Sequence, residues 1–514
     1  MIPYSLFLLS VGALGVLLLL GLQIFPRWQN LRRSITAVCL TLLTLIWLTF
    51  PQEYRWLLSL WSPTTVLAGR LLLEMTPAIW LLGAVLGATF SGVAWVRIAD
   101  ERRSLPLSGV LTIFILMLSW LALLSASLLM TLIAWATFDL LWGVAALIAG
   151  SDDECVTFGW AIHGIASLLL WVVSLLLSRE GSSCLWWLMQ PSEPLLSLLL
   201  IAALLRVGIY PWHLVFPQRV EKVGLLVVAA AAGPLLGFGL LYRLLSLPLE
   251  VHFPAWTITL GVISLLWGAL QAWTTTSERR PLLWAAYALL GVVVAGATLT
   301  GAASWLLRAL AAWWAGWVLL LLSRGHEGWL SPWSGPGLLA ALFLMGVPPS
   351  PLGALYRAAL GTASWMARLC LLMGLALTGA IFLRELARPA KGSVTPPWPW
   401  QQLALAGGLL LPLAGLLSGA TLAGGALVGW LLWGSAVLMA GGLVRWGAVV
   451  RMQLLRLRPL GELLDLRWLQ RTLWQGMEHL LGTVRALIEV VEGRGALLWS
   501  LLVVLLVLLV GGKQ

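Results

Sequence analysis

The sequence predicts an all-α polytopic membrane protein with about 14 to 16 transmembrane helices. Of its 514 residues, 61% are hydrophobic and only 10% are charged, and the mean hydropathy is +0.96. A soluble globular protein carries roughly 25% charged residues, so a chain this poor in charge cannot cover its surface in water. The composition leaves almost no room for a soluble domain, and it excludes a soluble enzyme and a disulfide-stapled secreted module.

Apolar runs of the length needed to cross a bilayer, about 20 residues, recur along the whole chain. They occupy 4–24, 35–50, 76–96, 105–126, 128–150, 157–178, 194–215, 222–246, 255–275, 281–300, 302–323, 336–362, 364–386, 401–420, 425–447 and 495–511. The runs are too long for barrel strands and lack the alternation over ~10 residues that such strands show. A helix forms all of its backbone hydrogen bonds within one segment, as lipid-buried segments require, so each run is expected to be helical.

Basic residues set the expected orientation. Arg27, Arg32 and Arg33 follow the first run and no basic residue precedes it, so that run is interpreted as a spanning helix rather than a signal peptide. Lys and Arg gather in the loops after odd-numbered runs, which the positive-inside rule places in the cytoplasm, with the N-terminus outside. This distribution accounts for the net charge of +11 without a nucleic-acid partner.

One stretch, from Leu460 to Val491, breaks the spanning pattern. Apolar residues recur there at helical spacing, and the other face carries acidic and basic side chains such as Glu462 and Arg485. The pattern predicts a lateral amphipathic helix along a surface, about 32 residues and ~48 Å long. It is either a peripheral membrane helix without a partner or a strut across neighbouring protein. Its length and the spanning run after it favour a strut.

Two apolar runs are interrupted by proline in similar ways. The first break surrounds Pro211 in 206–217, and the second surrounds Pro348 and Pro349 in 345–357. Proline removes an internal hydrogen bond and clashes with the preceding turn. At membrane depth a freed carbonyl is tolerated only beside protein or water. A single such proline is commonly an inert kink, but a pair in corresponding places of two halves predicts two inverted repeats with an ion pathway between them.

Few ionisable residues lie inside the apolar runs, and each costs roughly 2.5–3.5 kcal/mol at a helix centre on the insertion scale. They are Asp139, His163, Arg206, Arg243, Arg308, Arg357 and Arg368. Two of them, Arg243 and Arg368, are expected to extend toward helix ends. His163 is either a core histidine that donates to a carbonyl or a functional group.

Asp139 and Arg206 form a candidate charge pair. An unpaired Asp139 would be protonated at this depth, whereas a guanidinium beside it would keep it charged. His213, just past the first break, is the side chain best suited to accept and release protons near neutral pH. These three residues are therefore candidates for an ion pathway.

The four cysteines, Cys39, Cys155, Cys184 and Cys370, are scattered and form no CxxC pair. Their spacing matches no Fe–S, haem or zinc motif. We expect small apolar residues at these positions and no metal or cofactor on this chain.

The stretch Arg206-Val-Gly-Ile-Tyr-Pro211-Trp-His213-Leu-Val-Phe-Pro217 resembles the broken-helix signature of the antiporter-like membrane subunits. That family spans respiratory complex I, membrane-bound hydrogenases and multi-subunit cation/proton antiporters. Its pattern is a lysine, a proline-aromatic-histidine seven residues on, and a further proline. The spacing matches, with arginine in place of the lysine. Asp139 falls where the family keeps a glutamate on its fifth helix.

The resemblance extends over nearly the whole chain. The turn 277–280 resembles the basic turn before the family's tenth helix, and 346–357 resembles its second broken helix. The amphipathic stretch with a final anchor resembles the lateral helix of some members. The family's eighth-helix lysine would fall near Leu235, and the histidine and lysine of its eleventh helix fall near Ala311, Ala312 and Ala315, so these groups are replaced. Arginine does not release its proton, so a relay built on lysine titration cannot run unchanged.

The resemblance implies an antiporter-like membrane-arm subunit of a complex I-type NADH (or other donor):quinone oxidoreductase in the bacterial inner membrane. The chain itself would perform no redox chemistry. NADH, Fe–S clusters and quinone would belong to partner subunits. Together with the buried ionisable residues, the resemblance gives a candidate proton pathway of Asp139, Arg206, His213, Arg357, His163 and Arg308. The alternatives are a non-pumping scaffold of the same kind of complex, a subunit of a membrane-bound hydrogenase or cation/proton antiporter, and a stand-alone secondary transporter.

The expected organisation has six parts. They are N-terminal transmembrane helices in 1–104, a first inverted repeat in 105–250, a second in 251–390, C-terminal transmembrane helices in 391–458, the lateral amphipathic helix in 459–494 and a terminal transmembrane anchor in 495–514.

Overall fold

The structure is a computed structural model. It describes residues 4–59, 71–99, 107–148, 153–180, 182–213, 228–229, 231–247, 253–275, 280–301, 303–323, 335–387, 399–418, 427–456 and a few positions between 472 and 483. The chain divides into two compact units, Met1–Leu457 and Arg458–Gln514. The expected lateral helix and terminal anchor lie almost wholly outside the described residues, so the architecture below is that of the first unit.

The described part of the first unit is predominantly helical, as predicted. Its N-terminal helices are α1 (Tyr4–Gln23), α2 (Gln29–Leu48), α3 (Pro77–Ala99), α4 (Ser108–Leu124), α5 (Leu128–Ile148), α6 (Asp153–Arg179), α7 (Glu193–Val207) and α9 (Gly233–Leu245). The later helices are α10 (Ala255–Thr274), α11 (Arg280–Thr300), α12 (Ala303–Ser323), α13 (Gly335–Leu344), α14 (Pro351–Thr362), α15 (Trp365–Ala387), α16 (Pro399–Ser418), α17 (Leu427–Arg445) and α18 (Gly447–Arg456). Two short 3₁₀ helices, Pro26–Trp28 and Trp186–Leu188, lie between them.

Ten of the helices in the described part of the chain are long and apolar enough to cross a membrane. The protein is therefore an all-α polytopic membrane protein in class. The helices coincide with the apolar runs of the sequence to within a few residues at most ends, and α13 and α14 divide one run at its proline break. The internal inverted repeats stay a prediction.

A small β-hairpin was not expected from the sequence. Strands β1 (Tyr54–Ser59) and β2 (Leu71–Met75) pair antiparallel, with Arg55 opposite Glu74. The outer edge of β2 continues onto the connection between α4 and α5, where the N–H of Ala126 donates to the carbonyl of Leu72 at 3.0 Å. The hairpin thereby joins the start of α3 to the start of α5.

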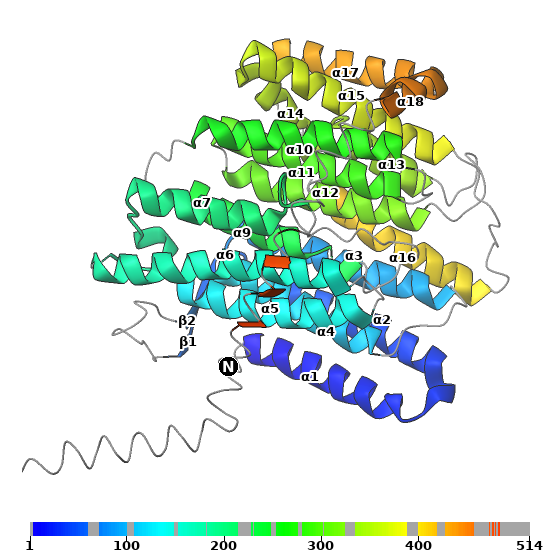
Figure 1. Cartoon of the computed structure of the whole chain (residues 1–514). Helices are drawn as coiled ribbons and strands as arrows, with labels where there is room; N and C mark the ends of the chain where they lie inside the picture. The colour runs from blue at the N-terminus through cyan, green and yellow to red at the C-terminus, as the bar shows by residue number, and fades with distance from the viewer. Residues whose placement is uncertain are drawn as a thin grey trace, which may run out of the picture. The chain divides into compact units, whose positions relative to one another are not determined.

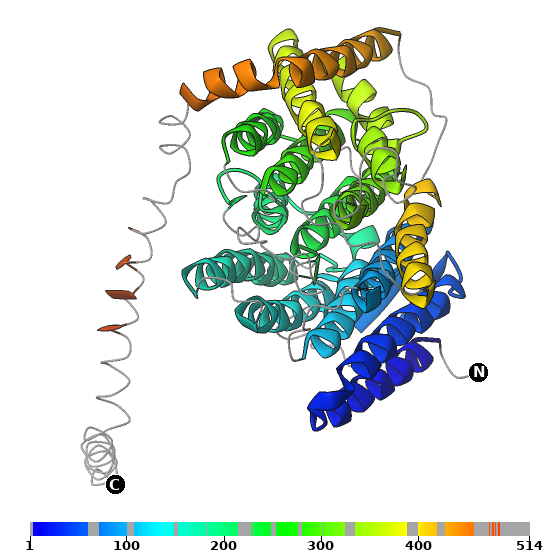
Figure 2. The ribbon, with the colours of Figure 1, turned by 90° about the vertical axis from the view of Figure 1, so that its right-hand side faces the viewer.

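Helices distant in sequence pack side by side (Figure 1). The view turned by 90° shows α16 alongside α3 at the N-terminal end of the bundle (Figure 2). Glycines permit the closest contacts. A Cβ atom on Gly92 of α3 would lie 2.5 Å from the carbonyl of Gly408 of α16, and one on Gly291 of α11 would lie 2.4 Å from that of Gly261 of α10. Small residues allow such backbone contact between membrane helices.

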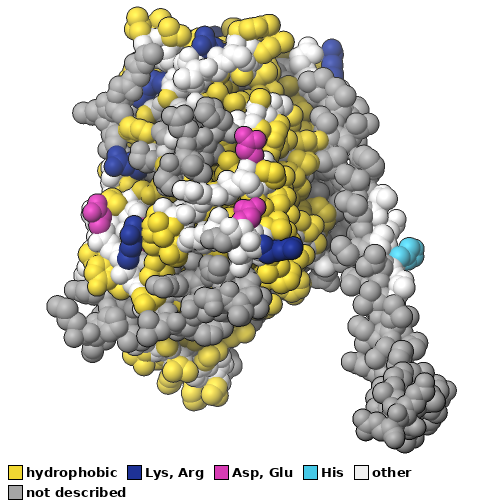
Figure 3. Space-filling model, turned by 90° about the vertical axis from the view of Figure 1, so that its left-hand side faces the viewer, with side chains coloured by type: hydrophobic (Ala, Val, Ile, Leu, Met, Phe, Trp, Pro, Cys, Tyr) yellow, Lys and Arg dark blue, Asp and Glu magenta, His cyan; other side chains and the backbone are white. Residues whose placement is uncertain are grey.

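Hydrophobic side chains cover large areas of the described surface on the face that Figure 3 shows. Large hydrophobic side chains are exposed along the outer helices, for example Leu14 at 63%, Leu403 at 73% and Leu438 at 79%. A water-facing protein rarely exposes continuous apolar surface of this extent, whereas lipid tails cover it without cost. This surface indicates an integral membrane protein.

Candidate functional site

Three helices bring Asp139, Arg206 and His163 into contact. They lie on α5, the last turn of α7 and α6. Nη1 of Arg206 lies 2.6 Å and Nδ1 of His163 lies 3.1 Å from the same Oδ1 atom of Asp139. The side chains of Arg206 and His163 are 0% and 1% exposed, and that of Asp139 is 14% exposed. The contact expected between Asp139 and Arg206 is present, and His163 joins it. We call these three residues the charge triad.

Aromatic rings enclose the arginine of the charge triad. The guanidinium carbon of Arg206 lies 4.9 Å from the ring centroid of Trp135 and 5.3 Å from that of Phe138, both on α5. Ring faces attract a cation and exclude water. Burying a guanidinium is still costly unless a counter-charge is in contact with it. Asp139 is that counter-charge.

The other two members of the charge triad are held from the side of α6. The indole Nε1 of Trp160 donates to the backbone carbonyl of Asp139 at 2.7 Å, which joins α5 to α6. The ring centroid of Trp142 lies 5.1 Å from that of His163. Gly233, at the start of α9, lies beside the imidazole, since an added Cβ would be in ordinary van der Waals contact with its Cε1 at 3.8 Å. The positions of α5, α6 and α9 therefore fix the geometry of the triad.

The first proline break begins directly after Arg206. Helix α7 ends at Val207, and Gly208 adopts a left-handed conformation with φ of 72°. The N–H of Gly208 donates to the carbonyl of Leu204 at 3.0 Å, a common helix ending that favours glycine. The N–H of Tyr210 then donates to Oγ of Ser264 on α10 at 2.9 Å. The chain leaves the helix at the charge triad, as the sequence predicted. Residues 214–217 lie outside the described part.

His213 lies past this break in an enclosure of its own. It is 0% exposed. Four aromatic rings surround the imidazole at centroid distances of 5.6 to 6.2 Å: Tyr210, Trp267, Trp284 and Tyr287. His213 is not a member of the charge triad.

The second break also ends its helix at a left-handed glycine. Helix α13 ends at Leu344, and Gly346 is left-handed with φ of 84°. The N–H of Gly346 donates to the carbonyl of Phe343 at 3.0 Å, and that of Val347 to the carbonyl of Leu342 at 2.9 Å. This pair of bonds is the Schellman motif. The second predicted break is therefore also present.

Side chains satisfy the carbonyls that the second break frees. Each donor comes from a residue beyond the end of α13: Ser350 Oγ donates to Phe343 at 2.7 Å, Tyr356 Oη to Leu344 at 3.2 Å, and Trp433 Nε1 to Met345 at 2.9 Å. A freed carbonyl at membrane depth needs protein or water beside it. Here the protein itself supplies the partners.

Two further arginines predicted for the pathway lie apart from the charge triad. Arg357 on α14 is 1% exposed, and its guanidinium carbon lies 3.9 Å from the ring centroid of Trp430 on α17. Arg308 on α12 is half-buried, 6.0 Å from the ring centroid of Trp305. The structure therefore brings together three of the six candidate pathway residues and leaves His213, Arg357 and Arg308 in other places.

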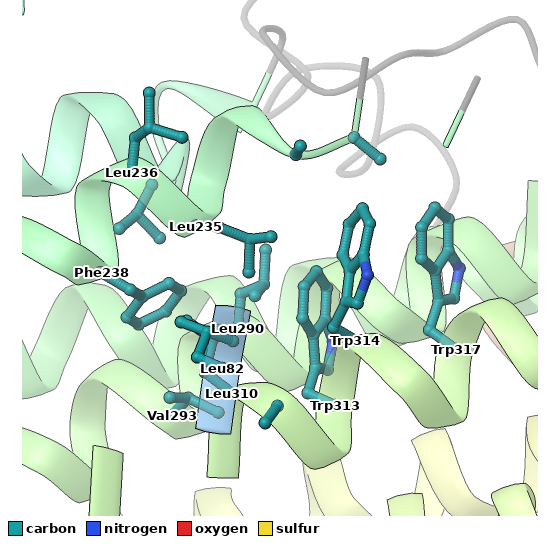
Figure 4. Close-up of a cluster of buried hydrophobic side chains, with 14 of the residues drawn as sticks. Leu82, Leu235, Leu236, Phe238, Leu290, Val293, Leu310, Trp313, Trp314 and Trp317 are labelled. Carbon is teal, nitrogen blue, oxygen red and sulfur yellow. The ribbon is translucent and has the colours of Figure 1, made fainter. Parts of the chain in front are cut away.

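Large apolar side chains fill the interior around Leu235 (Figure 4). Leu235 is 0% exposed, and Leu82, Leu290 and Leu310 are buried in the same cluster. Trp313, Trp314 and Trp317 of α12 form the other side of it. The Nε1 of Trp314 donates to Oγ1 of Thr89 at 2.6 Å, and that of Trp313 to the carbonyl of Ala286 at 2.9 Å. Leucine and tryptophan therefore occupy the region where the resemblance implied lysine and histidine.

The expectation for Arg243 was wrong, because it is a buried ion-pair residue. Its Nη1 donates to Oε2 of Glu74, a carboxylate that also accepts from Nε of Arg55 at 2.9 Å. Sequence reasoning missed Glu74 because it lies just before α3 in a segment interpreted as a loop. Arg368 is half-buried, and its Nη2 donates to the carbonyl of Gly361 at the end of α14. Among the described residues, no group of three or more His, Cys, Asp or Glu side chains could hold a metal ion.

Comparisons with known proteins show likeness in structure. No protein-family model matches the sequence, and no curated protein does either. A chain of the Mrp complex from Dietzia sp. DQ12-45-1b is similar over 98% of this chain and 63% of that one, with a TM-score of 0.74 and 16% identity. This chain thus spans under two thirds of the length of that Mrp chain.

Two respiratory complexes also contain similar chains. A chain of respiratory complex I from Thermus thermophilus, with bound aureothin, is similar over 80% of this chain and 97% of that one (TM-score 0.61, 20% identity). A chain of the membrane-bound sulfane sulfur reductase, an archaeal respiratory membrane complex, is similar over 98% of this chain and 99% of that one (TM-score 0.65, 14% identity). The protein therefore shares its fold with chains of these three membrane complexes.

Proposed function

We propose that this protein is an antiporter-like membrane-arm subunit of a complex I-type donor:quinone oxidoreductase. Electron transfer in partner subunits would drive proton translocation through the membrane arm. The charge triad beside a broken helix is the observation that carries the proposal. A lipid-shielded carboxylate between a permanent cation and an imidazole has an energy that depends strongly on which partner it contacts. The similar chain in respiratory complex I supports this assignment.

The members of the charge triad have different roles in the proposal. Arg206 keeps its proton and supplies a fixed positive charge. Asp139 and His163 are the two groups that exchange a proton as their contact changes. His213 receives the proton beyond the break, and Arg357 and Arg308 set the electrostatic potential of the second repeat. Redox groups (NADH, Fe–S clusters, quinone) are held by partner subunits.

The proposal includes a topology. The first inverted repeat spans 105–250 and the second spans 251–390, with transmembrane helices in 1–104 and 391–458. The lateral helix 459–494 and the anchor 495–514 hold neighbouring subunits together. The N-terminus lies outside a bacterial inner membrane.

Affinity purification through a tag on this chain, followed by mass spectrometry and reconstitution in vesicles, tests the proposal. We expect quinone-reducing subunits to co-purify and their electron donor to drive proton uptake. Recovery of nickel–iron hydrogenase subunits or small antiporter subunits in their place would assign the chain to those complexes. Ion transport by the purified chain alone would contradict the proposal and establish a stand-alone transporter.

A second candidate function is a non-pumping scaffold in the same kind of complex. The apolar interior around Leu235 and Trp314 favours it, because a hydrated relay across that region needs polar side chains that leucine and tryptophan do not supply. The assembled complex distinguishes the two candidates. A scaffold predicts the same number of protons translocated per electron when Asp139 is replaced by Asn, whereas a coupling subunit predicts fewer.

A further inference from the structure

A second buried charge network lies near the opposite end of α9 from the charge triad. Glu74 on β2 accepts from Nε of Arg55 at 2.9 Å through Oε1 and from Nη1 of Arg243 through Oε2. The Arg55 side chain is 55% exposed, whereas those of Glu74 and Arg243 are 11% and 7% exposed. One carboxylate is thus shared between a surface guanidinium and a buried one. We call these three residues the hairpin network.

The hairpin network joins the ends of several helices. Nη2 of Arg243 donates to the carbonyl of Leu123 at the end of α4 at 3.4 Å. The preceding residue on α9, Tyr242, shares a hydrogen bond of 3.1 Å between its hydroxyl and Oγ1 of Thr76, directly before α3. Strand β2 is bonded to the connection that leads into α5, as described above. The ends of α4 and α9 and the segments that lead into α3 and α5 therefore meet around the hairpin network.

Two of these helices lead directly to the charge triad. From Arg243 to Gly233, where an added Cβ would lie 3.8 Å from the imidazole of His163, α9 spans ten residues, or ~15 Å at 1.5 Å each. Along α5, Asp139 follows Leu128 by eleven residues, or ~16 Å. Helix α9 also has little freedom against α7, because a Cβ on Gly237 would lie 2.6 Å from the backbone nitrogen of Val207. These two helices are the routes by which a displacement at the hairpin network would reach the triad.

We propose that Arg55, Glu74 and Arg243 are positioning residues for the charge triad, which fix α9 and α5 and thereby the contact of Asp139 with His163. The inference rests on the proposed function of the triad. Glu74 contacts no member of the triad in the described structure, so it acts through the helices and not on the proton itself. The exposed Arg55 is the partner that can exchange with water, while Arg243 stays buried.

The test uses the intact complex that contains this chain, reconstituted in vesicles and driven by its own electron donor. The variants are Glu74→Gln, Glu74→Asp and, as a direct test of the triad, Asp139→Asn. For Glu74→Gln we expect proton translocation per electron to fall several-fold and its pH profile to move, because the imidazole of His163 is repositioned. Glu74→Asp keeps the charge and is expected to restore most of the coupling. Loss of assembly alone would lower the yield of complex without moving the pH profile.

A charge-neutral double variant covers the case in which Glu74→Gln does not assemble. Glu74→Gln/Arg243→Gln leaves no uncompensated buried charge, which is the main cost of breaking such a pair. We expect this variant to assemble and to keep the shifted pH profile. If the double variant translocates as many protons per electron as the wild type, with the same pH profile, the inference is overturned. If Asp139→Asn lowers translocation while Glu74→Gln and the double variant leave it unchanged, the inference fails and the proposed function stands. If Asp139→Asn also has no effect, the proposed function fails.

Discussion

At the scale of single residues, the main feature is one carboxylate oxygen in contact with two nitrogen atoms. Arg206 and His163 both meet Oδ1 of Asp139, at 2.6 and 3.1 Å. Because arginine keeps its proton, any proton exchange in the triad falls to Asp139 and His163. An arginine at position 206 thus restricts which members of the site can exchange a proton.

Replacement of Asp139 by Asn tests the stability contribution of this contact. Asn retains the shape of the side chain but leaves Arg206 without its counter-charge, and breaking a buried pair costs about 3–5 kcal/mol. We expect a clearly lower melting temperature of the detergent-solubilised protein, measured by thermal unfolding. Thr137→Asn, on the exposed side of α5, is the control and is expected to change it little. Equal melting temperatures for the two variants would show that the contact does not contribute to stability.

The sequence predicted part of this site. Asp139 and Arg206 could be paired in advance, because both are charges inside apolar runs and each needs a partner there. His163 remained ambiguous between a core histidine and a functional one. Glu74 and Arg243 were not paired, because 169 residues separate them and only the folded hairpin brings them together.

At the scale of elements, the two breaks end their helices alike but differ in their surroundings. The first carries Arg206 and opens directly beside the charge triad, whereas Ser350, Tyr356 and Trp433 cap the carbonyls of the second. The positions of both breaks follow from proline and glycine in the sequence. Their capping partners could not be predicted, because Trp433 comes from a different helix.

Replacement of Gly346 by Ala tests the geometry of the second break. A left-handed conformation costs an L-residue about 1–2 kcal/mol, and the added Cβ would lie 2.8 Å from Cα of Gly353. We expect a lower melting temperature for this variant. In contrast, Gly361→Ala in α14 has open space around the new Cβ and is expected to be neutral or slightly stabilising. A Gly346→Ala protein as stable as Gly361→Ala would contradict this geometry.

At the scale of the whole molecule, a charged site in the N-terminal half lies apart from an interior filled by leucine and tryptophan. The helices could be located from their apolar runs, because lipid imposes length and composition on every spanning segment. The β-hairpin could not, since its pairing is non-local. The resemblance places Leu235 near a position where the family has a lysine, and the structure adds the tryptophans of α12 on the other side of the same buried cluster (Figure 4).

Replacement of Trp314 by Ala tests this packed interior. Truncation of a fully buried tryptophan costs about 3–5 kcal/mol and leaves a cavity. We expect a lower melting temperature and a faster passive proton leak in vesicles. Trp314→Phe preserves most of the volume and is expected to leak little more than the wild type. Trp256→Ala, at a position that is 38% exposed, is the matched control. An unchanged leak for Trp314→Ala would show that this side chain does not seal the interior.

The double variant Asp139→Asn/Arg206→Gln, in the reconstituted complex, tests most directly whether the charge triad acts in coupling or only holds helices together. The two substitutions remove both charges at once and so avoid an unpaired guanidinium, which lets the complex assemble. The measurement is the number of protons translocated per electron. If the triad couples the two processes, this number falls well below the wild-type value while electron transfer continues. A wild-type ratio in an assembled complex would contradict the proposed function and leave the pair a purely structural role.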